Sequence, residues 1–199
     1  MISIETGERK PRADVVRNRA SILDTAQRHF LAFGVGTSLE AVAKEAGVGP
    51  ATLYRHFPTR EALLAGVLQS RSEELITRQT QIAQMADPDK ALQQWLRALE
   101  DYFGAYSGLP EPLLLAARER EPENPLTLPC EQLIGTTEQY LAAAQRHGSV
   151  EPWVKGYDLF LAANSVAWIK GTGAGDESSL PALRRIIESG YRRPDRTCP

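Results

Sequence analysis

The sequence predicts an all-α protein of two domains, an N-terminal three-helix domain that contains a helix-turn-helix and a C-terminal helical bundle. Apolar residues recur at three- and four-residue spacing along nearly all of the 199 residues, which is the period of an amphipathic helix. No stretch alternates polar and apolar residues between turn signals, so we expect no sheet. Glycines and prolines divide the pattern into helices of ordinary length.

The first two helices are expected before residue 48. Thr37, with Glu40 three positions later, predicts a capping box that starts a short second helix, and Gly47 ends that helix because glycine takes a positive φ at little cost. The first helix spans about residues 17–33 and ends at Gly34. Its apolar residues share one face and are Ile22, Leu23, Ala26, Phe30 and Phe33.

The third helix begins at Pro50, a position where the missing N–H of proline costs nothing. It runs to about Phe57, and Pro58 stops it. The turn before it is short, so residues 37–57 read as a helix-turn-helix. Thr59 is placed to cap a long fourth helix with the apolar stripe Leu63, Leu64, Val67, Leu68 and Leu75.

Longer helices are expected in the second domain. Asp87 starts one that extends to about Tyr106, and Pro110 begins a shorter one. Three prolines within residues 121–129 predict a loop. The remaining helices are expected at about 130–147, 151–170 and 180–187. We place the domain boundary at residue 60, so that residues 1–60 form an N-terminal arm and the helix-turn-helix domain and residues 61–199 form the second domain.

Charge is unevenly distributed, although the net charge is only −2. Residues 1–60 carry nine Lys and Arg against six Asp and Glu, a net charge of +3, and the rest of the chain carries −5. A basic module joined to an acidic one indicates that the first faces phosphates, because neutralising a phosphate releases condensed counterions.

Several other function classes lack support. No apolar run approaches the roughly 18 residues that span a bilayer, and the polar N-terminus does not resemble a signal peptide, so we expect a cytoplasmic protein without membrane contact. The two cysteines lie far apart, and the three histidines are scattered. We find no phosphate-binding loop, nucleophile motif or metal-spaced set, and we therefore expect no enzyme, catalytic residue, cofactor or metal.

The third helix has the pattern of a helix that reads DNA. Thr52 and His56 lie four residues apart and share a face with Arg55, while Leu53 and Phe57 point into the core. The forked donor of Arg55 suits a guanine edge. Small groups at the amino end can touch thymine methyls, and phosphate contacts suit a further set. The amino-end residues are Pro50 and Ala51, and the phosphate set is Thr37, Ser38, Thr52, Tyr54 and Arg60.

Each of these features also has a second interpretation. A helix-turn-helix outline occurs in helical proteins that bind no DNA. Taken alone, His56 could be a surface histidine and Tyr54 could lie at the edge of the core. The basic residues Arg9, Lys10 and Arg12 could form a solvated tail, or they could follow a groove and add affinity for DNA of any sequence.

The segment ILDTAQRHFLAFGVGTSLEAVAKEAGVGPATLYRHFPTREALLAGV, which starts at Ile22, resembles the N-terminal domain of the tetracycline-repressor (TetR) family. Its most specific part is AGVGPATLYRHFPTREAL, Ala46 to Leu63. The resemblance implies a dimeric repressor whose C-terminal helices pair the subunits and hold an inducer. Gly49 stands where many relatives have a capping Ser or Thr, so their sequence preference does not transfer. Ser38 matches a phosphate-contacting helix start, and the positions that touch DNA are matched by Pro50, Ala51, Thr52, Tyr54, His56 and Arg60.

Aromatic residues recur at helical spacing in the second domain, where they either fill the core or line a ligand pocket. We hypothesise a pocket for an apolar or aromatic small molecule. Its candidate residues are Trp95, Tyr102, Phe103, Tyr106, Thr137, Asn164 and Trp168. The last two long helices are expected to form the two-fold interface of a homodimer through Phe160, Leu161, Leu183, Ile186 and Ile187.

The sequence thus predicts a ligand-responsive regulator, a repressor released from a palindromic double-stranded operator by a small-molecule effector. Ligand contacts would favour a spacing of the two recognition helices that no longer matches the major grooves, and the long fourth helix would carry the shift. Two alternatives remain open: a DNA-binding adaptor controlled by a protein partner, which would hold no cavity, and a helical ligand carrier or enzyme with an incidental helix-turn-helix.

Overall fold

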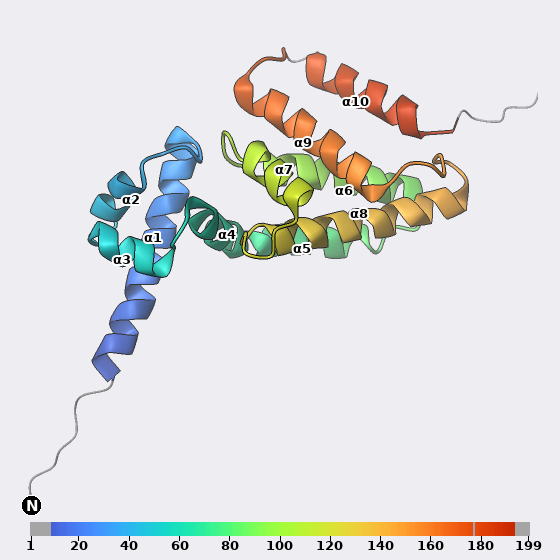
Figure 1. Ribbon diagram of the computed structural model, residues 1–199. Coiled ribbons are helices and arrows are strands. Elements are labelled where there is room, and N and C mark those ends of the chain that lie inside the picture. Colours follow the sequence, from blue (N-terminus) through green and yellow to red (C-terminus); the bar gives the residue numbers. More distant parts are fainter. Residues whose placement is uncertain (1–8, 177, 194–199) are drawn as a thin grey trace, which may run out of the picture.

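The computed structural model describes residues 9–176 and 178–193, with side chains from residue 14 onward. These residues contain no strand, only an isolated bridge between Val150 and Arg192, so the all-α prediction is confirmed. Figure 1 shows the helices α1 (Arg9–Phe33), α2 (Leu39–Glu45), α3 (Pro50–His56), α4 (Arg60–Ser70), α5 (Ser72–Ile82), α6 (Pro88–Phe103), α7 (Pro110–Glu119), α8 (Thr127–His147), α9 (Gly156–Thr172) and α10 (Ser179–Tyr191).

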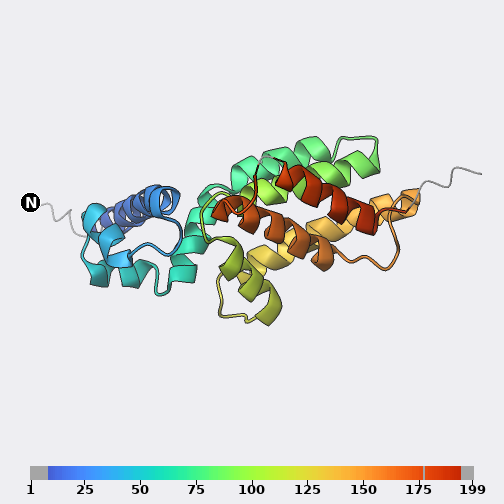
Figure 2. The same cartoon turned by 90° about the horizontal axis from the view of Figure 1, so that it is seen from above.

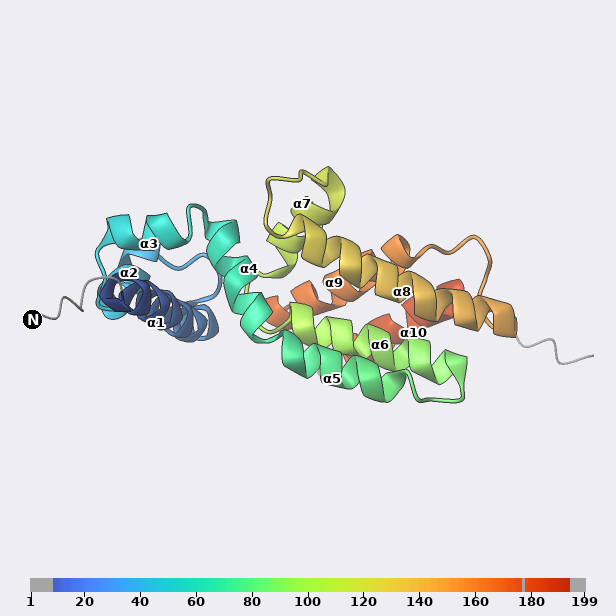
Figure 3. The ribbon, with the colours of Figure 1, turned by 90° about the horizontal axis from the view of Figure 1, so that it is seen from below.

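The molecule is elongated, with α1–α3 at one end and α5–α10 at the other (Figures 1 and 2). Helix α4 joins the two parts, and α5 runs alongside α6 (Figure 3). Helices α6, α8 and α9 pack against one another at the centre of the larger part, while α10 covers α9 from outside. No helix within the described ranges is long and apolar enough to cross a membrane.

The helix caps largely follow the predicted chemistry. Thr59 caps α4 by accepting a hydrogen bond of 3.1 Å from the N–H of Ala62, as predicted. The cap of α2 is Ser38, which accepts from the N–H of Ala41 at 3.2 Å, so the prediction that Thr37 caps this helix is wrong by one residue. The hydroxyl of Thr37 lies instead 3.3 Å from Nδ1 of His29.

The predicted long fourth helix is divided in two at Arg71, whose backbone has φ −102° and ψ 0°. Ser70 and Ser72 flank the break, and their hydroxyls donate to the carbonyls of Val67 and Gln69 at 2.7 and 2.8 Å. Such local side-chain bonds compete with the regular ladder of a helix. Any movement along this stretch would therefore have to pass through a break.

Several other boundaries also differ from the prediction; helix α9, for example, starts at Gly156 and not near residue 151. Helix α1 starts at Arg9, eight residues earlier than expected. The prediction missed its first turns because they carry no apolar periodicity; Val16, which follows them, is 68% exposed. Helix α8 starts at Thr127, within the predicted loop, with Pro129 in its first turn. The first four N–H groups of a helix have no partner within the helix, so proline costs nothing there.

The larger of two hydrophobic clusters runs from α1 through α4 and α6 to α8 and α9. The two ends also meet directly at the α6–α7 corner, where the carbonyl of Ser107 accepts a 2.9 Å hydrogen bond from the N–H of Val35. Gly34 beside it has φ +77°, and a Cβ there would lie only 2.7 Å from that carbonyl oxygen. The turn after α1 therefore needs glycine for its backbone conformation and for this close approach.

Candidate DNA-binding surface and ligand cavity

Helix α3 has one face in the core and one face in solvent. Leu53 and Phe57 are 0% and 2% exposed, as predicted. On the other side Pro50, Ala51, Tyr54 and Arg55 are exposed, while Thr52 and His56 are half-buried. Arg55 makes no hydrogen bond or ion pair with any described residue. The helix therefore projects a short row of side chains that ends in an unpaired guanidinium.

Glu40 of α2 lies beside this row and was not among the predicted site residues. Its carboxylate accepts from the Tyr54 hydroxyl at 3.2 Å and from the Ser38 hydroxyl at 2.9 Å. The pKa of Glu40 is lowered by its backbone hydrogen bond and then by these two hydroxyls, so the carboxylate stays charged. Its negative charge in turn raises the pKa of Tyr54. The hydroxyl of Tyr54, which the sequence assigns to phosphate contacts, is thus hydrogen-bonded to the carboxylate of Glu40.

Arg60 is turned toward the protein. Its Nη1 donates to the carbonyls of Val35 and Thr37 at 2.6 and 2.7 Å, so Arg60 holds the α1–α2 turn in place. Nothing in the sequence indicated this role, because periodicity does not show which carbonyls lie near a cation. Its contact with phosphate stays a prediction.

Two of the other described basic side chains of the first part, Arg28 and Arg17, form ion pairs, and Arg19 lies over the ring of Phe57 at 5.2 Å. Arg28 contacts Asp24 and Glu45 at 3.7 and 3.2 Å, and Arg17 pairs with Asp14. The side chains of the predicted basic arm, Arg9, Lys10 and Arg12, lie outside the described residues. Arg55 is therefore the exposed cation on α3 that is best placed to meet a DNA base.

A cavity of about 210 Å³ lies between the α4–α5 stretch, α6 and the first half of α8. Of the predicted ligand residues, Trp95 and Tyr102 line it. Trp95 is 1% exposed, stacks on Tyr140 at 5.5 Å between ring centroids, and donates its indole N–H to Thr137 Oγ1 at 2.9 Å. The other lining residues are Ala65, Leu68, Gln69, Ser72, Leu75, Ile76, Gln79, Pro129, Gln132, Leu133 and Thr136.

The other predicted ligand residues do not reach this cavity. Phe103 and Tyr106 fill the core, with Phe103 packed edge-to-face on Phe160 at 5.2 Å and Tyr106 on Phe30 at 5.8 Å. Thr137 and Asn164 are 0% exposed and also lie outside the lining. Trp168 is 53% exposed on the outside of α9. Core packing, the second interpretation of the aromatic stripes, therefore accounts for Phe103 and Tyr106.

Sequence reasoning missed the polar wall of the cavity. Gln69, Ser72, Ile76 and Gln79 follow one another at three- and four-residue spacing, so they share a face across the α4–α5 break. Their mixed polar and apolar character resembles an ordinary solvated face. The exposure of Gln69 and Ile76 places them at the mouth.

The outer face of α9 and α10 carries exposed apolar side chains. Ile186 is 68% exposed, whereas Leu161, Leu183 and Ile187 are half-buried. Of these, Leu161 packs against the larger core cluster, and Ile187 lines the seam between α6, α9 and α10. Phe160 is 0% exposed and belongs to the core, which corrects its assignment to the two-fold interface. The opposite side of α9 faces outward.

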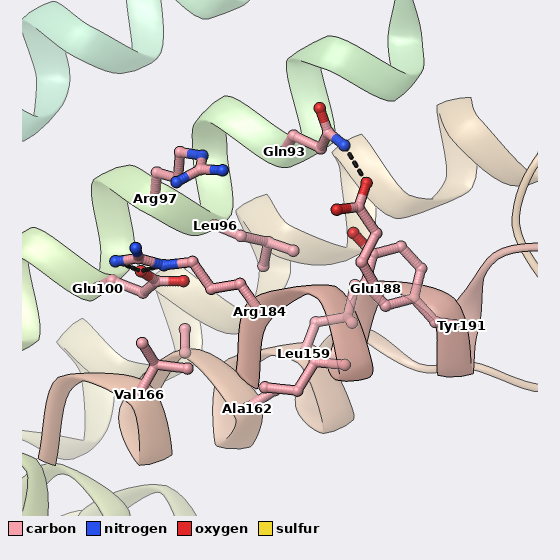
Figure 4. A pocket seen from close by; sticks show the side chains of 12 residues that line it. Gln93, Leu96, Arg97, Glu100, Leu159, Ala162, Val166, Arg184, Glu188 and Tyr191 are labelled. Atoms are coloured by element: carbon pink, nitrogen blue, oxygen red, sulfur yellow. Dashed lines mark hydrogen bonds and ion pairs between the residues drawn. The ribbon is translucent and has the colours of Figure 1, made fainter. Parts of the chain in front are cut away.

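Helix α10 is fixed to α6 and α9 along a tight seam (Figure 4). Arg184 donates to the carboxylate of Glu100 through Nε and Nη2 at 2.7 and 2.6 Å, and Gln93 bonds to Glu188. The void along the seam measures about 40 Å³, which is room for a few waters. This seam therefore positions α10 and holds no ligand.

Comparison with known proteins agrees with this geometry. Residues 22–67 match the family described as bacterial regulatory proteins, tetR family, and residues 87–193 match the C-terminal domain of SbtR-like transcriptional regulators. An HTH-type transcriptional regulator of Staphylococcus aureus is 39% identical over 72 residues, which are 36% of this chain and 39% of that protein. The chain therefore matches about two fifths of that relative's length.

Solved structures extend the match over nearly the whole chain. A TetR transcription regulatory protein of Mycobacterium vanbaalenii is 30% identical, over 92% of this chain and 99% of its own, with a TM-score of 0.48. A TetR transcriptional regulator of Streptomyces coelicolor is 29% identical, over 87% and 98%, with a TM-score of 0.52. Both proteins are described as TetR regulators of transcription. This chain belongs to the TetR family of bacterial transcriptional regulators.

Proposed function

We propose that this DNA-binding regulator is a homodimeric repressor that leaves a palindromic operator when a small molecule binds. The proposal is carried by the presence of two distinct sites in one chain. Helix α3 offers an exposed face with Arg55, which has no hydrogen-bond or ion-pair partner among the described residues, and a cavity of about 210 Å³ lies in the other part. That cavity supports control by a ligand over control by a protein partner alone. The repressor would act in the cytoplasm.

The DNA contacts divide into two sets. Arg55 would read a guanine edge, with Pro50, Ala51 and His56 against neighbouring bases. The phosphate backbone would be held at the α2 and α3 starts and by the Arg60 region, which position the protein without reading sequence. The residues in this second set are Thr37, Ser38, Thr52, Tyr54 and Arg60.

The homodimer would form through the outer face of α9 and α10. Ile186 and Trp168, at 68% and 53% exposed, are large apolar side chains in open solvent, and their burial against a second subunit would be favourable. A two-fold axis there would place the α3 helices of both subunits on one side of the dimer. Their separation would match one DNA turn, roughly 34–36 Å, or a multiple of it.

Two links would couple the cavity to α3. One is the packing of α4 on α1. The other leads from Tyr102, near the end of α6, through the following turn to Tyr106, whose ring packs on Phe30, and to Ser107, which holds Val35. A ligand that shifts α6 would therefore displace the turn on which α2 begins. Effector and operator would then lower each other's affinity by the same factor.

Selection of operator sequences from random DNA by the purified protein tests this function. We expect an inverted repeat that contains a guanine in each half. Arg55→Ala should reduce discrimination at that guanine by about 1–3 kcal/mol, whereas Arg118→Ala, an exposed arginine on α7, should leave it unchanged. Enrichment of no sequence, or equal behaviour of the two variants, would contradict the proposal.

A further inference from the structure

We propose that the effector is an uncharged, flat molecule of one or two rings that carries a hydrogen-bonding group. This inference rests on the proposed function and concerns the cavity between α4, α5, α6 and α8. The effector's ring would lie deep against Trp95, and its polar group would face the mouth.

The lining of the cavity is neutral. None of its thirteen described residues is Asp, Glu, Lys, Arg or His. Its polar groups are amides and hydroxyls, which are uncharged and can form hydrogen bonds with the neutral groups of a ligand. An ion that left water for this site would find no counterion, and an unpaired buried charge costs far more than a hydrogen-bonded neutral group. The polar lining residues are Gln69, Ser72, Gln79, Gln132, Thr136 and Tyr102.

Charged side chains that lie behind one wall of the cavity are already paired. Leu75 and Tyr102 separate the cavity from a narrow cleft lined by Arg71, Glu74, Arg78 and Asp101. There Arg78 contacts Asp101 at 3.0 Å, and Arg71 contacts Glu74 at 3.6 Å. Asp101 also contacts a second cation at 3.3 Å, Lys170 of α9. A charged ligand would therefore gain no partner by displacing Tyr102.

The two aromatic residues of the wall have different roles. Trp95 and Tyr102 lie seven residues apart on α6, so they share a face. The indole N–H of Trp95 is taken by Thr137, which leaves only ring surface for a ligand. The hydroxyl of Tyr102 makes no hydrogen bond within the described part of the chain, and burial raises the pKa of Tyr102 to about 12. Tyr102 would therefore donate to a ligand as a neutral phenol.

The size and depth of the cavity set the shape of the ligand. A cavity of about 150 Å³ holds benzene, so 210 Å³ accommodates a ring with a substituent or a fused pair. The floor is apolar: it is formed by Leu68, Leu75 and Trp95, which are at most 8% exposed. The exposed Gln69 and Gln132 lie at the mouth. This gradient orients the polar end of the ligand outward.

Three probes of one shape and different charge test the inference: benzamide, benzoate and benzamidine. They share a ring and a flat substituent, and at pH 7 they are neutral, anionic and cationic. Calorimetric titration into the full-length dimer should give benzamide an affinity at least tenfold above the other two. Equal or tighter binding of either ion would overturn the inference, and so would failure of benzamide to bind.

A charged variant places the binding in this cavity. Gln132→Glu puts a carboxylate at the mouth on an exposed position and should raise the affinity for benzamidine relative to benzamide at least tenfold. Gln139→Glu adds the same charge on the exposed side of α8, outside the lining, and should keep the wild-type preference. An unchanged preference in Gln132→Glu would show that the probes bind elsewhere and would overturn the inference.

Operator binding by the same samples distinguishes failure of the proposed ligand class from failure of the proposed function. Wild-type protein that binds its operator but does not prefer benzamide contradicts the ligand class alone. Protein that keeps its thermal unfolding transition but selects no operator contradicts the proposed function. Unfolding curves of both glutamate variants show whether each is folded before either result is interpreted.

Discussion

At the scale of single residues, Glu40 sets the charge of the surface that α3 presents. Its carboxylate holds the Tyr54 hydroxyl at 3.2 Å and the Ser38 hydroxyl at 2.9 Å. A phosphate approaching Tyr54 would meet this negative charge. The hydroxyl would also have to leave the carboxylate before it could donate to DNA, so Glu40 opposes binding by both means.

Replacing Glu40 with Gln should therefore tighten DNA binding. The amide keeps the shape and hydrogen-bonding capacity of the side chain but removes the charge. We expect a severalfold gain at low salt for operator and unrelated DNA alike, which shrinks as salt shortens the Debye length to about 10 Å at 0.1 M. Fluorescence anisotropy across a salt series measures it. Weaker binding, or a gain confined to the operator, would contradict this role of Glu40.

The sequence predicted the burial of side chains better than it predicted their hydrogen-bond partners. Leu53 and Phe57 are buried as their spacing indicates, because a period fixes which face a side chain occupies. Arg60 was assigned to phosphate, yet it bonds the carbonyls of Val35 and Thr37. A cation suits either acceptor chemically, and only the folded turn brings those carbonyls within reach.

At the scale of elements, two contacts decide how the helices are placed. The first is the α6–α7 corner, where Ser107 holds the turn that follows α1. The second is the seam of α10, where Arg184 pairs with Glu100, a carboxylate that is only 5% exposed. Each contact joins segments far apart in the chain, and each lends itself to a matched pair of variants.

Gly34→Ala should destabilise the protein more than Gly47→Ala does. Both glycines have positive φ, +77° and +71°, so both variants pay about 1 kcal/mol or more for the backbone conformation. Only at Gly34 would the new Cβ meet the Ser107 carbonyl, at 2.7 Å, whereas nothing lies within 4 Å at Gly47. Urea unfolding compares the two free energies. Equal losses would mean that the corner yields without cost.

Arg184→Ala should loosen α10, because it leaves the carboxylate of Glu100 buried without a counterion. Breaking such a pair costs about 3 kcal/mol or more. Arg185→Ala, at the next and exposed position, should change the unfolding free energy little. Urea unfolding and sedimentation together test this prediction, since a displaced α10 should also weaken the dimer. Similar stability of the two variants would contradict it.

Features that depend on residues close together in the chain were predicted correctly more often than features that depend on the folded environment. Thr59 caps α4 as predicted because a cap is an interaction between near neighbours in the chain. The break at Arg71 was missed, since Leu68 and Leu75 keep the same period on both sides of it. The α6 stripe likewise indicated a buried face but gave no sign that Trp95 and Tyr102 face a cavity while Phe103 and Tyr106 face the core.

At the scale of the whole molecule, one continuous core joins the end that carries α3 to the part that holds the cavity. The division at residue 60 stays a prediction, because Leu63, Leu64 and Val67 of α4 pack in the same core as α1 and α6. A ligand that moves α6 therefore acts on a connected body. Two such bodies, paired through α9 and α10, would present their α3 helices to DNA together.

Substituting Asp for Ile186 should separate the subunits. The side chain is 68% exposed, so a charge is tolerated in the monomer but would be buried at the two-fold interface. Sedimentation should show a monomer with an unchanged helical spectrum, and operator affinity should fall by orders of magnitude. Ser189→Asp lies on the same helix and is also exposed, which controls for added charge. A stable Ile186→Asp dimer would place the interface elsewhere.

Hydroxyl-radical footprinting of the purified protein on its selected operator shows whether two exposed α3 helices enter one duplex together. We expect two equivalent protected half-sites, related by a two-fold axis and centred about 10–10.5 base pairs or a multiple apart, both weakened by Arg55→Ala. A single protected site, or two sites whose protection does not depend on Arg55, would contradict it.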